Sequence, residues 1–267
     1  MVKKNDIHPT ACVHPKAKLG KNVCVGAYSV IGEKATIGEG TCIGNSCLID
    51  GNSRIGSRCK IFTGAVIGSI PQDLKYKGED TQVIIGDDNV IREYVTVNLG
   101  TGDKGKTQIG NANLLMAYSH VAHDCEVGNN VIIANVGTLA GHVTVEDRVI
   151  IGGMTAVHQF VRICKMAIIG GCSKVIKDIP PFMMADGHPA RVYGLNSVGL
   201  KRAQVSPENV RNLKAALKLI FREGLPVSKA LEKIKSQITD DSYVTCLLNF
   251  ISNSQRGICK GSQSDNS

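Results

Sequence analysis

The stretch that decides the fold is residues 19–44, LGKNVCVGAYSVIGEKATIGEGTCIG, in which an aliphatic residue returns at every sixth position. A glycine follows each of the five, from Leu19-Gly20 to Ile43-Gly44. An α-helix repeats every 3.6 residues and an ordinary strand every two, so neither produces this period. A coil of three short strands joined by tight turns does, because each strand then points one aliphatic side chain to a common axis.

The same period covers most of the chain. It extends back to Ile7 and forward to Ile67, resumes at Ile85, and ends at Val175. Two polar segments without the period interrupt it, at residues 69–82 and 98–107. The aliphatic positions on either side of each gap are separated by multiples of six, so the phase of the repeat survives. We therefore expect two excursion loops that leave a rigid scaffold and return to it, and such loops often carry binding groups.

This pattern resembles the hexapeptide-repeat family of left-handed parallel β-helices. The resemblance implies a triangular prism with about 18 residues per coil and assembly as a homotrimer. We expect a mainly β protein, with the β-helix over residues 1–190 and a C-terminal α-helical domain over 191–267.

Helical signals begin after the repeat ends. Ser206 and Pro207 suit the N-cap and first turn of a helix whose apolar face ends near Ile220, and Gly224 suits its C-terminal end. Two further helices are predicted at residues 227–238 and 243–251. The tail from residue 254 is expected to be disordered at its end.

Charge and composition narrow the class of protein. The net charge is +8, and the segment from Arg148 to Arg222 holds twelve Lys/Arg against three acids, 12 − 3 = +9. Such a surface suits an acidic partner or a phosphorylated ligand. Aromatic residues make up only 4% and no nucleic-acid-binding motif occurs, which disfavours nucleic acid. No apolar run is long enough to span a membrane and no secretory signal precedes the repeat, so we expect a cytoplasmic protein that does not span the membrane.

The ten cysteines are scattered without a Cys-x-x-Cys pair. This spacing predicts reduced, mostly packed thiols and argues against a disulfide scaffold or a structural metal site. No phosphate-binding glycine-rich loop opens a helix, so no cofactor is expected.

The candidate chemistry lies where coils stack. In an 18-residue coil, His123, Gly141 and Gln159 form one column, and Asp124 and His142 form the next. An imidazole beside a glycine N–H provides a general base and an oxyanion donor, as acyl transfer to an alcohol requires. A neighbouring carboxylate can orient the imidazole.

Several motifs resemble more closely the UDP-N-acetylglucosamine O-acyltransferases of lipid A biosynthesis. They are Pro71–Tyr76 (PQDLKY), Ile91–Glu93 (IRE), His120–Cys125 (HVAHDC), Leu139–Val143 (LAGHV), Gly152–Phe160 (GGMTAVHQF), Asp178–Pro181 (DIPP) and Gly194–Arg202 (GLNSVGLKR). The resemblance spans nearly the whole chain. It implies transfer of a 3-hydroxyacyl chain from acyl carrier protein to the glucosamine 3-hydroxyl of UDP-N-acetylglucosamine, at a site between subunits.

The resemblance also assigns roles to residues. His123 is the general base, Asp124 its orienting acid and the Gly141 N–H the oxyanion donor. The residues implied in substrate binding are Gln72, Asp73, Lys75, His120, His142, His158, Gln159, Asn196 and Arg202. Gly171 stands at the family's acyl-chain ruler, where a glycine leaves room for a longer chain.

This chain departs from the family at two places. Asn98-Leu99 stands where a His-Arg pair is usual, and Pro189 stands where a histidine is usual, although His188 precedes it. These changes concern the acyl length or the acceptor, which can carry a 3-hydroxyl or a 3-amino group.

Alternative functions remain at this stage. The related N-acyltransferase of the same pathway has a separate domain before its repeats, whereas the repeats here begin by Ile7. A zinc enzyme related to β-helical carbonic anhydrase would need three converging imidazoles, such as His120, His123 and His142. A non-catalytic repeat scaffold would show no turnover with any acyl donor.

Overall fold

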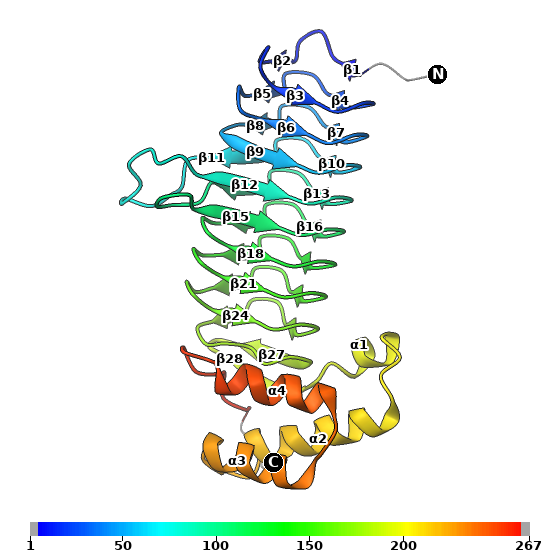
Figure 1. Ribbon diagram of the computed structural model, residues 1–267, viewed down its shortest axis with the longest axis vertical. Helices are drawn as coiled ribbons and strands as arrows, with labels where there is room; N and C mark the ends of the chain where they lie inside the picture. Colours follow the sequence, from blue (N-terminus) through cyan, green and yellow to red (C-terminus); the bar gives the residue numbers. More distant parts are fainter. Residues whose placement is uncertain (1–4, 263–267) are drawn as a thin grey trace.

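The six-residue period forms short parallel strands that stack into a three-sided prism, with helices packed at its C-terminal end (Figure 1). The computed structural model describes residues 5–262. Three sheets make the sides, and successive strands of the chain pass from the first sheet to the second, then to the third and back to the first.

The first sheet contains β1 (Asp6–Ile7), β4 (Cys24–Val25), β7 (Cys42–Ile43), β10 (Lys60–Ile61), β13 (Val90–Ile91), β16 (Leu114–Leu115), β19 (Ile132–Ile133), β22 (Ile150–Ile151), β25 (Ile168–Ile169), β27 (Met183–Gly187) and β28 (Ala190–Leu195). The second contains β2 (Cys12–Val13), β5 (Val30–Ile31), β8 (Leu48–Ile49), β11 (Val66–Ser69), β14 (Thr96–Asn98), β17 (His120–Val121), β20 (Thr138–Leu139), β23 (Ala156–Val157) and β26 (Lys174–Val175). The third contains β3 (Lys18–Leu19), β6 (Thr36–Ile37), β9 (Asn52–Ile55), β12 (Gln82–Ile85), β15 (Lys106–Ile109), β18 (Glu126–Val127), β21 (Thr144–Val145) and β24 (Arg162–Ile163).

The register confirms coils of 18 residues in the regular part of the prism, since Val121 pairs with Leu139 and Leu139 with Val157. The turns that follow strands of the first, second and third sheets are called the first, second and third corners. A residue with positive φ recurs in the turns, for example Asp124 at 57° and His142 at 59°. This left-handed conformation, uncommon outside glycine, lets the chain turn sharply at each corner.

The aliphatic residue of each repeat lies inside the prism. Twelve of the largest side chains are less than 2% exposed, and eleven of them are isoleucine or leucine from Ile31 to Ile163. The twelfth, Phe182, lies between the last coil and the helices, where its ring contacts Tyr243 at 5.4 Å between centroids. Fully burying one such side chain contributes about 1.5–3 kcal/mol, so the stack of identical rungs is the main source of stability.

Both excursions leave the same corner of the prism. Residues 70–81 connect β11 to β12, and residues 99–105 connect β14 to β15, so each replaces a turn of the second corner. They belong to consecutive coils, because β11 pairs with β14 and β14 with β17. The two loops therefore lie beside the turn that carries His123.

The C-terminal region forms four helices, α1 (Ser197–Arg202), α2 (Pro207–Phe221), α3 (Val227–Gln237) and α4 (Ser242–Ser252). Ser206 is the N-cap of α2 as predicted, since its hydroxyl accepts from the Asn209 N–H at 3.1 Å. Helix α2 ends at Phe221 with Arg222 as C-cap, and Gly224 follows with a φ of +68°. The short helix α1 was not predicted separately.

The sheet continues through β28 to Leu195, immediately before the helices, and the proposed domain boundary at residue 190 stays a prediction. The tail returns to the prism, where Ile258 pairs with Asp178 and Gly261 with Val192. The disorder predicted for its end concerns residues 263–267, which lie outside the described residues. Within residues 5–262, no helix combines the length and apolar character needed to cross a membrane.

Candidate active site

The candidate site is built on three stacked turns of the second corner. His123 and Asp124 follow β17, Gly141 and His142 follow β20, and Phe160 lies in the turn after β23. Backbone bonds hold the turns together, from the His142 N–H to the His123 carbonyl at 3.0 Å and from the Phe160 N–H to the Gly141 carbonyl at 3.2 Å. The columns predicted from the 18-residue spacing are therefore present.

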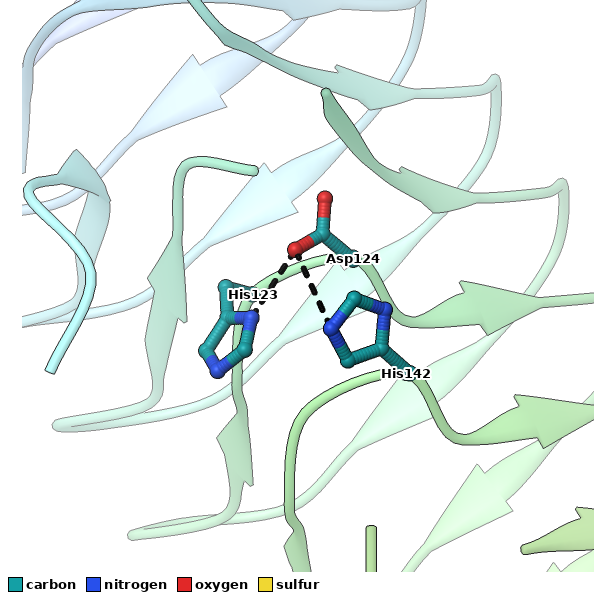
Figure 2. Close-up of side chains that lie close together, drawn as sticks. All are labelled: His123, Asp124 and His142. Carbon is teal, nitrogen blue, oxygen red and sulfur yellow. Dashed lines mark hydrogen bonds and ion pairs between the residues drawn. The ribbon is translucent and has the colours of Figure 1, made fainter. Parts of the chain in front are cut away.

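His123 is paired with the carboxylate that follows it in the chain. Its Nδ1 lies 2.9 Å from Oδ2 of Asp124 (Figure 2), and its side chain is only 8% exposed. An ionised carboxylate can only accept a hydrogen bond, so this pair places the imidazole proton on Nδ1. Nε2 is then left unprotonated, as a general base requires.

Asp124 is held by the second excursion. The Thr101 hydroxyl donates to Oδ2 at 2.6 Å, and the Thr101 N–H lies 3.0 and 3.1 Å from the two oxygens. Burial acts to raise the pKa of Asp124, but the hydrogen bonds from Thr101 and His123 outweigh it and leave the pKa lowered. The Asp124 N–H donates in turn to the Thr107 hydroxyl at 3.0 Å. Sequence reasoning missed Thr101 because it lies outside the repeat.

Gly141 is required by the position of the imidazole. A Cβ at this residue would overlap Cε1 and Nε2 of His123. Only a glycine allows the ring to lie directly against the backbone of the next coil. The column of His123 and Gly141 predicted from the sequence is thus a tight contact between a ring and a backbone.

The Gly141 N–H has no acceptor among residues 5–262. At the third corner, the corresponding N–H of Asn111 donates to the Asn129 side chain at 2.8 Å, one coil further on. The coil after Gly141 places Gln159 in that position, and its side chain makes no such bond. Unpaired N–H groups on buried residues are rare, so this donor is a candidate for binding a ligand oxygen.

His142 closes the other side of the cluster. Its Nε2 lies 3.8 Å from Asp124 Oδ2, and its ring meets that of His123 edge-on at 5.1 Å. Phe160 stacks parallel to the His142 ring at 4.6 Å between centroids. Phe160 was not predicted as a site residue, although it stands 18 positions after His142.

His123, Asp124 and His142 also form the one group of three metal-ligating side chains found in the described part of the chain, with ligand atoms within 4.8 Å of one another. The three imidazoles considered from the sequence, His120, His123 and His142, do not form such a group. His120 lies outside it, and its third member is Asp124. Asp124 Oδ2 already accepts from Thr101 and His123, so a metal would have to displace the His123 proton.

Two further histidines lie near the corner. His120 accepts from or donates to the Thr96 hydroxyl at 2.6 Å, and burial, with a smaller effect of His123, lowers its pKa. His158 is exposed, and its Nδ1 lies 2.8 Å from Nη2 of Arg256 and 3.1 Å from the Gln159 carbonyl oxygen. Arginine only donates and a carbonyl only accepts, so Nδ1 makes one of these two hydrogen bonds at a time.

A cavity of about 490 Å³ extends from this corner to the C-terminal tail. His142 and Phe160 line one end, and Arg162 and Arg256 contribute two positive charges against the one negative charge of the buried Asp178. An anionic group of a bound ligand is favoured there.

The remaining predicted residues occupy three places. Gln72, Asp73 and Lys75 lie on the first excursion, where the Asp73 carboxylate accepts from the Lys75 N–H at 2.9 Å. Gly171 lies in the first corner. Asn196 and Arg202 belong to α1 and its cap, and α1 projects on the side of the prism opposite the excursions (Figure 1).

Asn196 is 4% exposed and has a structural role within one chain. Its Oδ1 accepts from the Gly199 N–H at 2.8 Å, capping α1, and its Nδ2 donates to the Met166 carbonyl at 2.8 Å. Arg202 is exposed at the last residue of the helix.

The departure at Asn98-Leu99 connects the two excursions. The Asn98 amide donates to the Ile70 carbonyl at 3.3 Å, while its Oδ1 is buried without a partner in the described residues. Leu99 is 5% exposed and packs beside Gly51. The His-Arg pair of the resemblance is thus replaced by a buried contact between loops.

A base–acid pair beside an unpaired backbone donor, on a hexapeptide-repeat prism, defines an acyltransferase of the hexapeptide-repeat class. Residues 178–259 match the family model described as Udp N-acetylglucosamine O-acyltransferase, Domain 2, and residues 106–136 match Bacterial transferase hexapeptide (six repeats). An acyl-[acyl-carrier-protein]–UDP-N-acetylglucosamine O-acyltransferase from Janthinobacterium sp. (strain Marseille) is 52% identical over 261 residues, covering 95% of this chain and 99% of that protein.

Solved structures agree over almost the full length. LpxA from Acinetobacter baumannii has a TM-score of 0.91 and 42% identity, covering 95% of this chain and 99% of that one. The UDP-N-acetylglucosamine acyltransferase from Campylobacter jejuni has a TM-score of 0.90 and 37% identity, covering 96% and 100%. The chain belongs to the acyl-[acyl-carrier-protein]–UDP-N-acetylglucosamine O-acyltransferase family. The predicted left-handed parallel β-helix with C-terminal helices is confirmed.

Proposed function

We propose that this enzyme transfers a 3-hydroxyacyl chain from acyl carrier protein to the 3-hydroxyl of UDP-N-acetylglucosamine, the first step of lipid A biosynthesis. The family membership supports the reaction class. The observation that carries the mechanism is the juxtaposition of the His123 imidazole, fixed by Asp124 at 2.9 Å, with the Gly141 N–H, which has no acceptor among residues 5–262.

In the proposed mechanism, His123 Nε2 removes the proton of the sugar 3-hydroxyl as its oxygen attacks the thioester carbonyl. The tetrahedral oxyanion accepts a hydrogen bond from the Gly141 N–H. Asp124 stabilises the imidazolium that forms. The intermediate then expels the carrier thiolate, which takes the proton back from His123, and the ester is released.

We further propose a homotrimer with the site between neighbouring subunits. The first corner exposes apolar side chains on four consecutive coils, Tyr94, Tyr118, Val136 and Met154, each 47% to 66% exposed in one chain. Such a contiguous stripe favours a protein interface. Gly171 lies at the same corner, so a neighbour's second corner against it would join the proposed base to the proposed acyl groove.

The substrate-binding roles of the other residues follow from this arrangement. Gln72, Asp73 and Lys75, with His120, His142, His158 and Gln159, would line the cleft from one subunit. Arg202, which lies away from the excursions, would reach the nucleotide bound at a neighbour, and Asn196 would position α1. The basic segment from Arg148 to Arg222 would receive the acidic carrier protein, and we propose that the enzyme works in the cytoplasm.

The test is acyl transfer from 3-hydroxymyristoyl carrier protein to UDP-N-acetylglucosamine by the intact enzyme and by His123→Ala. We expect turnover from the first and a loss of at least about 100-fold in kcat from the second, since a positioned base contributes about 10²–10⁴-fold. His8→Ala, an exposed histidine at the other end of the prism, is the matched control. Undiminished turnover by His123→Ala contradicts the mechanism.

The zinc alternative is kept because His123, Asp124 and His142 can converge on one ion. Turnover that is lost with a chelator and restored by Zn²⁺ would favour it over base catalysis. The 3-amino acceptor is tested by offering both sugar nucleotides and comparing kcat/KM.

A further inference from the structure

Helix α4 packs on the last coils through one face. Tyr243, Cys246 and Phe250 occur at positions i, i+3 and i+7, which share a side of a helix. Tyr243 meets Phe182, and the Arg162 guanidinium lies 4.8 Å from the centre of the Phe250 ring. Between these contacts, Cys246 faces the third corner of the prism.

Cys164 lies in that corner, directly after β24, and is 2% exposed. Arg162, two residues before it, contacts Phe250 of α4, and the Cys246 thiol one turn earlier on that helix lies near enough to raise the pKa of Cys164. Two cysteines from segments 82 positions apart in the sequence are thus neighbours, one on the prism and one on a helix. Both are free thiols in this structure.

Charged groups surround the pair asymmetrically. The Cys164 Sγ lies 2.9 Å from Oε2 of Glu146, one coil before it, which favours the protonated thiol. The Lys165 ammonium lies 5.8 Å from the centre of the Phe182 ring, which Tyr243 of α4 also contacts, so a positive charge lies beside Cys246. The Cys164 thiol and then the charge of Lys165 lower the pKa of Cys246 to about 6, whereas the Cys246 thiol, burial and Glu146 raise the pKa of Cys164.

This arrangement has the parts of a thiol–disulfide exchange site. A thiolate on the half-buried Cys246 is the attacking group, and a protonated, buried Cys164 beside it is the resolving group. A surface hollow of about 340 Å³, lined in part by Glu146 and Lys165, lies next to the pair.

We propose that Cys164 and Cys246 are a redox-active dithiol that reacts with low-molecular-weight disulfides and closes a disulfide bond between the β-helix and α4. The Cys246 thiolate attacks one sulfur of glutathione disulfide, forming a mixed disulfide and releasing one glutathione. Cys164 transfers its proton to Glu146 and attacks the Cys246 sulfur, releasing the second glutathione. Two electrons pass from the protein to glutathione, and the new bond fastens α4 to the last coils.

The chain contains a natural comparison pair. Cys24 and Cys42 are register partners on neighbouring strands of the first sheet, and the Cys42 thiol, with burial, raises the pKa of Cys24 to about 11. The charge near that thiol is the Asp6 carboxylate, which raises the pKa further, in contrast to the lysine beside Cys246. The Cys24–Cys42 pair therefore tests whether proximity alone is sufficient for oxidation.

The experiment treats the folded, full-length enzyme with glutathione disulfide near neutral pH, blocks free thiols and maps tryptic peptides by mass. We expect a disulfide that joins the peptides Ile163–Lys165 and Ser236–Arg256. The mass of the linked peptide should be two hydrogens below the sum of the reduced peptides, and excess reduced glutathione should reverse the link. The double variant Cys24→Ser/Cys42→Ser should retain this product, and Cys246→Ser should lose it. Iodoacetamide should also alkylate Cys246 at least about tenfold faster than Cys12 at pH 7.

Absence of the linked peptide from the wild-type enzyme overturns the proposal, whatever the variants do. So does its formation only in denaturant, since the folded arrangement would then be irrelevant. Preferential oxidation of Cys24–Cys42, with Cys164 and Cys246 recovered as free thiols, also overturns it. The wild-type map decides the question even where a serine variant fails to fold.

Discussion

The Thr101 hydroxyl and the Asp124 carboxylate are joined by a 2.6 Å hydrogen bond that connects the second excursion to the proposed catalytic corner. The same Oδ2 accepts from His123 Nδ1. The loop therefore holds the acid, and the acid holds the imidazole. Thr101→Val removes the hydroxyl while keeping the side-chain shape and the backbone N–H.

We expect Thr101→Val to lower kcat by about tenfold, equivalent to about 1.4 kcal/mol, with little change in KM. A hydrogen bond to a charged group typically contributes about 1.5–3 kcal/mol. The expected loss is at or below this range because the Thr101 N–H still holds the Asp124 carboxylate in the variant. Steady-state acyl transfer measures the effect. Thr10→Val, a change at the opposite end of the prism, is the control, and an equal loss in both variants would show a general effect on the fold.

The lowered pKa of Asp124 predicts a pH dependence of stability. Its folded-state pKa lies below that of an unfolded aspartate, about 3.9. The ionised carboxylate therefore stabilises the fold fully above that pH, and the contribution is lost as the pH falls through the folded value. We expect Asp124→Asn to lower the free energy of unfolding at pH 7, with the difference shrinking below about pH 4.

Denaturant unfolding of wild type and Asp124→Asn between pH 3 and pH 7 measures this difference, with exposed Asp103→Asn as the control. A constant difference across that range would contradict the assigned role of the carboxylate. The same variant should lose turnover by orders of magnitude, because an amide does not stabilise the imidazolium.

The sequence predicts this fold well because one physical constraint repeats. Each aliphatic residue from Leu19 to Val175 must reach the same axis, so the period alone specifies the strands, the coils and the columns that bring His123 to Gly141. Phe160 stands 18 positions after His142, so the same period predicts that the two side chains stack. Helix α2 was located from Ser206 and its apolar spacing for a similar reason.

What lies outside the repeat could not be predicted in this way. Thr101 reaches Asp124 from a loop whose path no period describes, and Asn98 bonds to the other excursion at Ile70. The placement of Cys246 beside Cys164 depends on how α4 packs on the prism, a tertiary arrangement that local patterns do not contain. The roles assigned to Asn196 and Arg202 rest on resemblance, since no spacing in the sequence relates α1 to the second corner.

Gly141→Ala tests the contact between ring and backbone. The added methyl would overlap Cε1 and Nε2 of His123, so the imidazole must move away from the corner. Displacement of a catalytic base by about 1 Å is sufficient to lower the rate of the chemical step by about 100-fold. We expect a fall in kcat of that order with a nearly unchanged circular dichroism spectrum.

Gly194→Ala is the matched control, because a Cβ there has no neighbour within 4 Å. The crystal structure of Gly141→Ala should show the His123–Asp124 distance lengthened beyond 2.9 Å. Full activity with an unmoved ring would mean that the imidazole does not need this glycine.

Gly171→Met tests the acyl groove. A Cβ at Gly171 meets only Gly153, with its carbonyl oxygen at 3.2 Å and its nitrogen at 3.9 Å, and φ lies outside the left-handed region. The fold should therefore tolerate a larger side chain that projects from the first corner. Gly171 lies 48 residues after His123, or roughly 13 Å along the prism at the spacing of neighbouring strands.

A methionine in the groove at that depth should exclude the end of a long chain while leaving room for a short one. Each buried methylene contributes about 0.8 kcal/mol, so losing two or more changes selectivity by over tenfold. We expect the ratio of kcat/KM for 3-hydroxydecanoyl over 3-hydroxymyristoyl carrier protein to rise by at least about tenfold. Gly194→Met should leave the ratio unchanged, and an unchanged ratio in Gly171→Met would place the end of the acyl chain elsewhere.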